Sequence, residues 1–158
     1  MTKRLLIQCV GNPLNADDGA GRLVAERLRR QALPADVEIR EYWGEGTELL
    51  QDWDLAAGVI LVDAADSGAE VGKLHQLNPA KQPIPTNLCH KGSHQFGVAE
   101  ALETARALGK LPREIRLFAI EGADFRLGGE LSPEVLDTLD RLTRTIAQLA
   151  RLPTKNHG

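Results

Sequence analysis

The chain has few of the residues on which several protein classes depend. Its 158 residues include two cysteines, and aromatic residues make up 4% of the total. Two cysteines are too few for a disulfide scaffold, so we expect a reducing compartment, most simply the cytoplasm. The longest apolar run, residues 55–62, is too short to cross a bilayer, and the N-terminal run is too short for a signal peptide.

An excess of one charge is also missing. The formal net charge is −3, and 19 basic and 22 acidic residues are mixed along the sequence. This composition provides no basic face, so we expect neither nucleic acid nor a membrane as a partner. The length fits one domain with a sizeable core, which we assign to residues 1–152, followed by a flexible C-terminal tail at residues 153–158.

The hydrophobic pattern predicts alternating strands and helices. Strands are expected at about 4–10, 37–42, 58–64, 73–77 and 114–120, and helices from about 18, over 47–53 and 95–108, and from 133. The fourth strand follows the third with no room for a crossover helix, so we expect it to run antiparallel. This order predicts a single α/β domain with a mostly parallel five-stranded sheet and helices on both faces.

A glycine-rich turn with two adjacent carboxylates follows the first strand. It reads Gly-Asn-Pro-Leu-Asn-Ala-Asp-Asp-Gly-Ala-Gly over residues 11–21. Such a strand-to-helix turn lies at the carboxyl edge of a parallel sheet, where α/β proteins place their chemistry. Asp17 and Asp18 would repel a phosphate unless a cation lay between them, although each could also simply cap the helix.

Two further polar residues are expected at the same edge. Asp63 closes the third strand, and His94 stands at the predicted start of the third helix. Because the first and third strands of a doubly wound sheet lie side by side, these residues should converge with Asp17 and Asp18. Two carboxylates and an imidazole suit a divalent metal with water completing its shell. Taken singly, Asp63 could be a loop carboxylate and His94 a helix-start histidine.

Four short motifs together resemble a known family. They are Gly-Asn-Pro-Leu at 11–14, Asp-Asp-Gly-Ala-Gly at 17–21, Leu-Val-Asp-Ala at 61–64 and Ser-His-Gln-Phe-Gly at 93–97. In order and spacing the chain resembles the maturation endopeptidases of nickel-containing hydrogenases over nearly its whole length. The resemblance implies a twisted five-stranded sheet between helices, and a protease that removes a C-terminal extension from a hydrogenase large subunit after nickel insertion.

The resemblance also implies roles for the acidic edge. Asp18, which is glutamate in some members, Asp63 and His94 would bind nickel carried by the large-subunit precursor, and cadmium or zinc would be substitutes for it. Asp17 would orient or deprotonate a water that attacks a metal-polarised carbonyl, which completes a catalytic set of Asp17, Asp18, Asp63 and His94. Whether the neighbouring Cys89 and His90 add a soft-metal pair is left open.

One region departs from the family pattern. Several members carry Asp-Gly-Gly-Thr after the second strand, where the acid is thought to help select the substrate. This chain has Glu41, Tyr42 and Trp43 there, so we assign substrate selection to these three residues. Aromatic side chains supply contact area for a protein partner, although Trp43 could also cover the core.

Two other functions compete with the protease. A receiver-like phosphoacceptor domain also has acids after its first and third strands, but it needs a lysine after the last strand. Here the last strand is followed by Glu-Gly-Ala-Asp at residues 121–124, and such a domain has no use for His94. A non-catalytic nickel-binding chaperone would use the same residues, so the sequence does not separate it from the protease.

Overall fold

The secondary structure follows the predicted alternation. The computed structural model describes residues 3–92 and 94–152, so the predicted tail at 153–158 lies outside the described residues. The elements are β1 (Lys3–Val10), α1 (Ala20–Arg29), β2 (Val37–Tyr42), α2 (Gly46–Asp52), β3 (Ala56–Ala65), β4 (Leu74–Leu77), α3 (Val98–Ala107), β5 (Glu114–Glu121) and α4 (Pro133–Arg151), with short 3₁₀ turns at Ala16–Gly19 and Trp53–Leu55.

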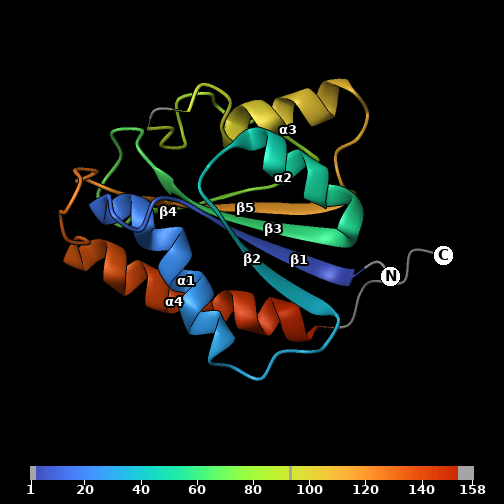
Figure 1. Cartoon of the computed structure of the whole chain (residues 1–158), viewed down its shortest axis with the longest axis horizontal. Helices are drawn as coiled ribbons and strands as arrows, with labels where there is room; N and C mark the ends of the chain where they lie inside the picture. Colours follow the sequence, from blue (N-terminus) through green and yellow to red (C-terminus); the bar gives the residue numbers. More distant parts are fainter. Residues whose placement is uncertain (1–2, 93, 153–158) are drawn as a thin grey trace.

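The strands form one sheet in the order β2-β1-β3-β5-β4. β1 pairs in parallel with β2 and β3, β3 pairs in parallel with β5, and β4 runs antiparallel to β5. Helices α1 and α4 cover one face and α2 and α3 cover the other (Figure 1). The predicted fold class is therefore confirmed, including the antiparallel strand and the adjacency of the first and third strands.

Both faces of the sheet are packed. Residues 58–65 of β3 are buried without interruption, which explains their continuous apolar run. The side chains of Leu61 and Leu117 pack toward α3, whereas Val62 and Phe118 pack toward α1 and α4. One apolar stripe of α4 lies in the core, with Val135, Leu139, Leu142 and Ile146 fully buried and Leu149 partly buried.

Two helices begin later than the sequence predicts. The two adjacent acids lie in the 3₁₀ turn, and α1 starts after it at Ala20. Helix α3 starts at Val98 rather than near residue 95, because Gly97 is extended and its amide donates a hydrogen bond to Glu100 Oε1 at 3.0 Å. His94 therefore lies in the loop before α3 and not at the helix start.

Helix α1 sits directly on the ends of two strands. A Cβ on Gly21 would lie 2.5 Å from the carbonyl oxygen of Val10 and 2.9 Å from that of Val62. Only glycine allows this approach, since no side chain then separates the helix from β1 and β3. The turn that precedes α1 is consequently held close to the carboxyl ends of both strands.

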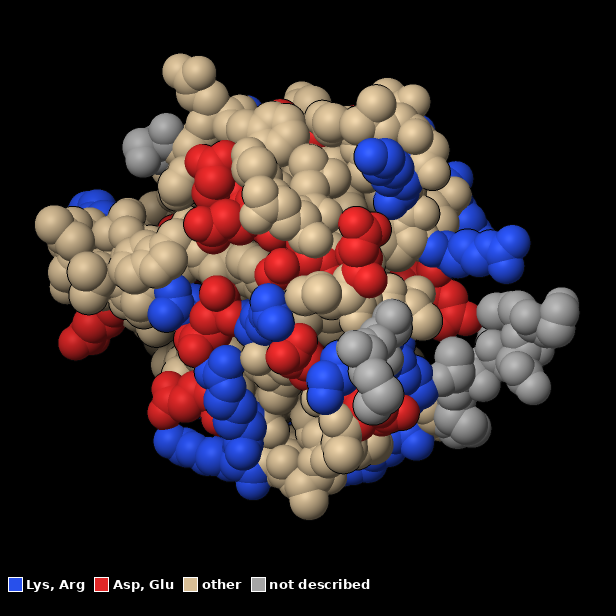
Figure 2. Space-filling view, turned by 45° about the vertical axis from the view of Figure 1, so that its right-hand side comes forward, with Lys and Arg blue, Asp and Glu red and all other residues tan. Residues whose placement is uncertain are grey.

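The two ends of the described fold meet at the opposite edge. The guanidinium of Arg4 donates hydrogen bonds to the carbonyl oxygens of Ala150 and Leu152, the latter at 2.9 Å. This contact joins the start of β1 to the end of α4, where the parallel strands begin. Acidic and basic side chains are interspersed on the face shown in Figure 2. None of the described helices has the length and apolar character needed to cross a membrane.

Candidate active site

Asp18 and Asp63 lie at the carboxyl ends of β1 and β3. The turn after β1 folds back tightly, since a Cβ on Gly11 would lie 1.9 Å from the carbonyl oxygen of Asp18. Gly11 has a φ of 146°, in the region that favours glycine. The amide of Asn12 then donates to Asp18 Oδ2 at 3.0 Å, which fixes this carboxylate beside the end of β1.

The two carboxylates are buried and act on each other. Asp63 is 2% exposed and Asp18 is 8% exposed. Burial raises the pKa of Asp63 well above its usual value, and the charge of Asp18 raises it further. Burial also raises the pKa of Asp18, against the lowering effects of the Asn12 amide and of His90 and His94. A cation beside the pair would relieve the repulsion between the two charged forms.

A buried thiol supports Asp63. Its Oδ1 accepts a hydrogen bond from the amide of Ala64 at 2.8 Å, and Cys89 forms a side-chain hydrogen bond with it. Cys89 is a free, buried cysteine whose pKa is raised well above its usual value by burial and by the Asp63 charge. Cys89 is therefore a thiol donor to Asp63 in this arrangement, while the neighbouring His90 turns to other partners.

His94 approaches from the side of β2. A Cβ on Gly44, two residues after β2, would lie 3.2 Å from Cδ2 of the His94 ring. His94 Nδ1 lies 3.7 Å from Oε2 of Glu45, and one third of its side chain is exposed. Gly44 thus leaves the room that the imidazole occupies, and the charge of His94 acts on Asp18.

These residues do not form a closed metal cage. Among the described residues, no group of three or more histidine, cysteine, aspartate or glutamate side chains is arranged to hold a metal ion. The structure brings Asp18 and Asp63 together, and His94 acts on Asp18 through its charge. Metal binding by the three residues stays a prediction.

Asp17 faces away from this pair, into the loop after β5. Its Oδ1 accepts the amide of Ser132 at 2.7 Å, and its Oδ2 accepts the Ser132 hydroxyl at 2.8 Å. The amides of Ala123 and Asp124 donate to the same Oδ2 at 2.8 and 3.1 Å. Asp17 is 0% exposed, and these four donors engage both carboxylate oxygens. The contacts favour a structural role, and the role of Asp17 as a base stays a prediction.

The residues predicted to select the substrate have different surroundings. Glu41 pairs with Arg22 at 2.7 Å, and Tyr42 is buried with its hydroxyl donating to Asp52 at 2.6 Å. Trp43 is 51% exposed, with the guanidinium carbon of Arg22 5.2 Å from its ring centroid. Of the three, Trp43 is therefore the side chain best placed to contact a partner.

Sequence reasoning did not find the surroundings of His90. Its Nδ1 lies 3.3 Å from Oδ2 of Asp66, and its ring stacks on Phe125 with centroids 3.9 Å apart and planes 9° from parallel. Asp66 follows β3 and Phe125 follows β5, so both stand at the edge that carries the carboxylates. The only sequence signal for this grouping was that Asp66 and Phe125 follow strands that end at the same edge, because no local motif links residues so far apart in the sequence.

Comparison with known proteins identifies the family. The sequence model described as hydrogenase maturation protease matches residues 22–149. The chain belongs to the hydrogenase maturation protease family. A relative is the hydrogenase expression/formation protein HupD of Bradyrhizobium diazoefficiens, 34% identical over 138 residues, which are 86% of this chain and 72% of HupD. HupD of Rhodobacter capsulatus is 30% identical over 140 residues, 87% of this chain and 67% of that protein.

Solved structures of this family share the fold. The hydrogenase maturating endopeptidase HybD from Escherichia coli aligns with a TM-score of 0.76 and 27% identity, over 94% of this chain and 92% of HybD. The protease HycI from Thermococcus kodakarensis has the same fold, with a TM-score of 0.71, 22% identity and coverage of 95% and 94%. The resemblance inferred from the sequence motifs is therefore confirmed, and the protein is an endopeptidase rather than a receiver-like domain.

Proposed function

We propose that this hydrogenase maturation protease removes the C-terminal extension of a hydrogenase large-subunit precursor after nickel has entered it. The nickel belongs to the substrate, and Asp18, Asp63 and His94 recognise it. Family membership supports the precursor as substrate. The free, buried state of Cys9 and Cys89 agrees with the cytoplasm as the place of reaction.

The buried pair of carboxylates is the observation that carries this proposal. Asp18 and Asp63 are close enough for the charge of one to raise the pKa of the other. A divalent cation beside them removes an unfavourable interaction that the free protein keeps. Nickel already held by the precursor needs few ligands from the protease, which agrees with an open site. Cadmium or zinc would bind the same donors in a test without precursor.

The scissile peptide would lie beside the recognised ion. Nickel would then act as the anchor that orders the precursor's C-terminal segment at the edge of the sheet, and water would attack the scissile carbonyl there. Trp43 would contact the precursor directly, while Glu41 holds Arg22 against it and Tyr42 supports the strand from the core. Substrate selection by residues 41–43 would therefore depend mainly on one exposed ring.

Processing of purified precursor tests the proposal. Nickel-loaded and nickel-free large subunit would be mixed with the protease and followed by mass spectrometry. We expect loss of the C-terminal extension from the nickel-loaded form alone. Asp18→Asn, Asp63→Asn and His94→Ala should each greatly slow it, whereas the exposed Asp54→Asn should not. Equal cutting of the nickel-free precursor would contradict nickel recognition, and bound nickel without any mass change would favour the chaperone.

Metal binding gives an independent readout. We expect the isolated protease to bind added Ni²⁺ or Cd²⁺ at one ion per chain in calorimetry, and His94→Ala to weaken that binding. An open site shares an ion with its partner rather than retaining it. One equivalent of metal that survives a chelator would instead indicate a resident cofactor and overturn the sensing role.

A further inference from the structure

Two separate segments hold His90, the end of β3 and the loop that follows β5. Its amide donates to the carbonyl oxygen of Ala64 at 2.9 Å, which fixes its backbone beside the end of β3. Nδ1 faces Asp66, and the ring lies flat on Phe125. A carboxylate on one nitrogen and an aromatic ring on one face restrict the orientation of the imidazole.

The loop that carries Phe125 is itself anchored. Asp17 binds this loop at Ala123 and Asp124, just before the aromatic ring, and at Ser132 beyond it. The amide of Asp17 also donates to the carbonyl oxygen of Asp124 at 2.9 Å. The buried acid beside Asp18 therefore holds the loop whose ring stacks on His90.

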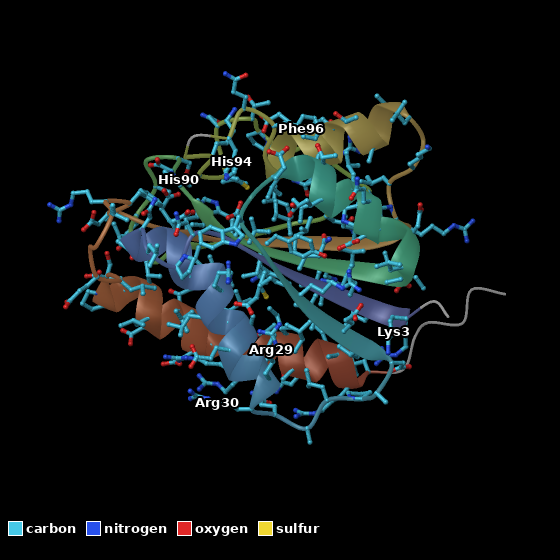
Figure 3. All side chains as sticks on the ribbon, in the orientation of Figure 1. Lys3, Arg29, Arg30, His90, His94 and Phe96 are labelled. Atoms are coloured by element: carbon cyan, nitrogen blue, oxygen red, sulfur yellow. The ribbon has the colours of Figure 1, made fainter. Side chains whose placement is uncertain are left out.

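His90 and His94 contact segments that follow different strands of the sheet. Strands β2 and β5 flank the central pair β1 and β3. His94 lies against Gly44, which follows β2, whereas His90 lies against Phe125, which follows β5. Both histidines act on Asp18, and the effect of His90 is the larger one. Figure 3 shows both histidines on the connection between β4 and α3, near the same end of the sheet.

The second ring nitrogen of His90 is available. With Nδ1 on Asp66, Nε2 makes no hydrogen bond to any residue that the structure describes. A Cβ on Gly92 would lie 3.8 Å from Nε2, so the chain leaves ordinary contact space there. The side chain is 16% exposed. A carboxylate on Nδ1 fixes the tautomer whose Nε2 accepts a proton.

We propose that His90 is the general base and then the general acid of peptide cleavage. Its neutral Nε2 takes one proton from the attacking water, whose oxygen bonds to the scissile carbonyl carbon while the π pair of the C=O bond moves to the carbonyl oxygen. Asp66 stabilises the imidazolium through Nδ1–H. The carbon–nitrogen bond then breaks with its electron pair on nitrogen, and Nε2 returns the proton to that nitrogen. The pair on the carbonyl oxygen re-forms the C=O bond as the carbon–nitrogen bond breaks. The products are a new carboxyl terminus and a free amine, and the imidazole is neutral again. The carboxylic acid then passes its remaining proton to the amine through water, which leaves a carboxylate and an ammonium group.

This inference rests on the proposed function in one respect, the position of the scissile peptide at the edge beside Asp18. Its test is the steady-state cleavage of nickel-loaded precursor by His90→Gln and His90→Ala. We expect kcat to fall about 10²–10⁴-fold with KM little changed, as for the loss of a general base. Imidazole added to the buffer should restore cleavage by His90→Ala in a concentration-dependent way, which recovery of folding alone would not do.

His75 provides a matched control. It also pairs with a carboxylate, that of Glu121 at 2.9 Å, and its side chain is 15% exposed against 16% for His90. His75→Gln should therefore cleave at the normal rate. Cleavage by His90→Gln within twofold of wild type, or a loss that imidazole does not rescue in a folded His90→Ala, would overturn the inference.

The outcomes separate this inference from the proposed function. Normal Cd²⁺ binding by His90→Gln, together with lost cleavage, would place the histidine in the chemical step rather than in metal recognition. Cleavage that ignores nickel but still needs His90 would overturn nickel recognition and support the base. Cleavage that needs nickel and Asp63 but not His90 would support nickel recognition and overturn His90 as the base.

Discussion

Asp17 and Ser132 are joined by two hydrogen bonds although 115 residues separate them in the sequence. The serine gives both its amide and its hydroxyl to one buried carboxylate. The same carboxylate holds Ala123 and Asp124 at the other end of the loop. The turn that precedes α1 and the loop that follows β5 therefore form one rigid side of the site.

Asp17→Asn should loosen that side of the site. The asparagine amide nitrogen cannot accept a hydrogen bond, so at least one buried donor loses its partner, and we expect the free energy of unfolding to fall by about 1–3 kcal/mol. Urea unfolding measures this loss, and limited proteolysis should show cleavage within residues 123–131. Ser132→Ala, which keeps the backbone amide, should lower the free energy of unfolding by less. An equal fall in the free energy of unfolding for Asp54→Asn, at an exposed position, would refute the anchoring role of Asp17.

Asp63 should make stability depend on pH. Its folded pKa is raised, so the unfolded chain ionises first, and stability falls as the pH rises above the unfolded value of about 3.9 toward the folded one. Asp63→Asn cannot ionise and should melt at a higher temperature than wild type at pH 8, with chelator present. The gain should shrink toward pH 4. A gain in melting temperature that does not depend on pH, or that Asp54→Asn shares, would show that it does not come from the raised pKa of Asp63.

Trp43→Ala should weaken precursor binding. The exposed ring and the arginine over it form a contact surface beside the site, and we expect KM to rise about tenfold, the size of an interface contact of about 1.4 kcal/mol, with kcat unchanged. Leu108→Ala is a control, since this leucine is 63% exposed and follows the last residue of α3. An unchanged KM for Trp43→Ala would remove the ring from substrate selection.

Gly44→Ala should displace His94 without touching a carboxylate. The added Cβ would lie 3.2 Å from the imidazole, at a φ of 111°. Gly68 has a φ of 84° with nothing within 4 Å, so Gly68→Ala brings backbone strain but no contact. Both variants should melt at lower temperature, whereas only Gly44→Ala should weaken Cd²⁺ binding and slow cleavage. Equal activities for the two would mean that His94 tolerates displacement.

Much of the fold could be predicted because its signals are local. The run at residues 58–64 is apolar on both faces, and burial of residues 58–65 accounts for it. The strand predicted at 37–42 is β2, which lies at one edge of the sheet. The predicted start of α3, near residue 95, was wrong. The helix begins at Val98, because Gly97 is extended and its amide donates a hydrogen bond to the Glu100 side chain.

The site was less predictable because its contacts are distant. Sequence position placed Asp18 and Asp63 at one edge, since parallel strands end together. It could not separate the roles of Asp17 and Asp18, because the donors to Asp17 come from more than 100 residues away. It also could not place Tyr42 in the core, because its polar partner, Asp52, lies in the next helix.

The contact of Arg4 with the end of α4 has a consequence for the order of the chain. Because Arg4 binds the carbonyl oxygens of Ala150 and Leu152, the first strand and the last helix meet at the pole opposite the carboxylates. A short linker could join these ends, and the chain could be opened in the turn after α3, near Gly109, which has no neighbour within 4 Å of a Cβ. Such a circular permutant would keep every element around the site. The site would therefore not depend on the order in which the chain links these elements.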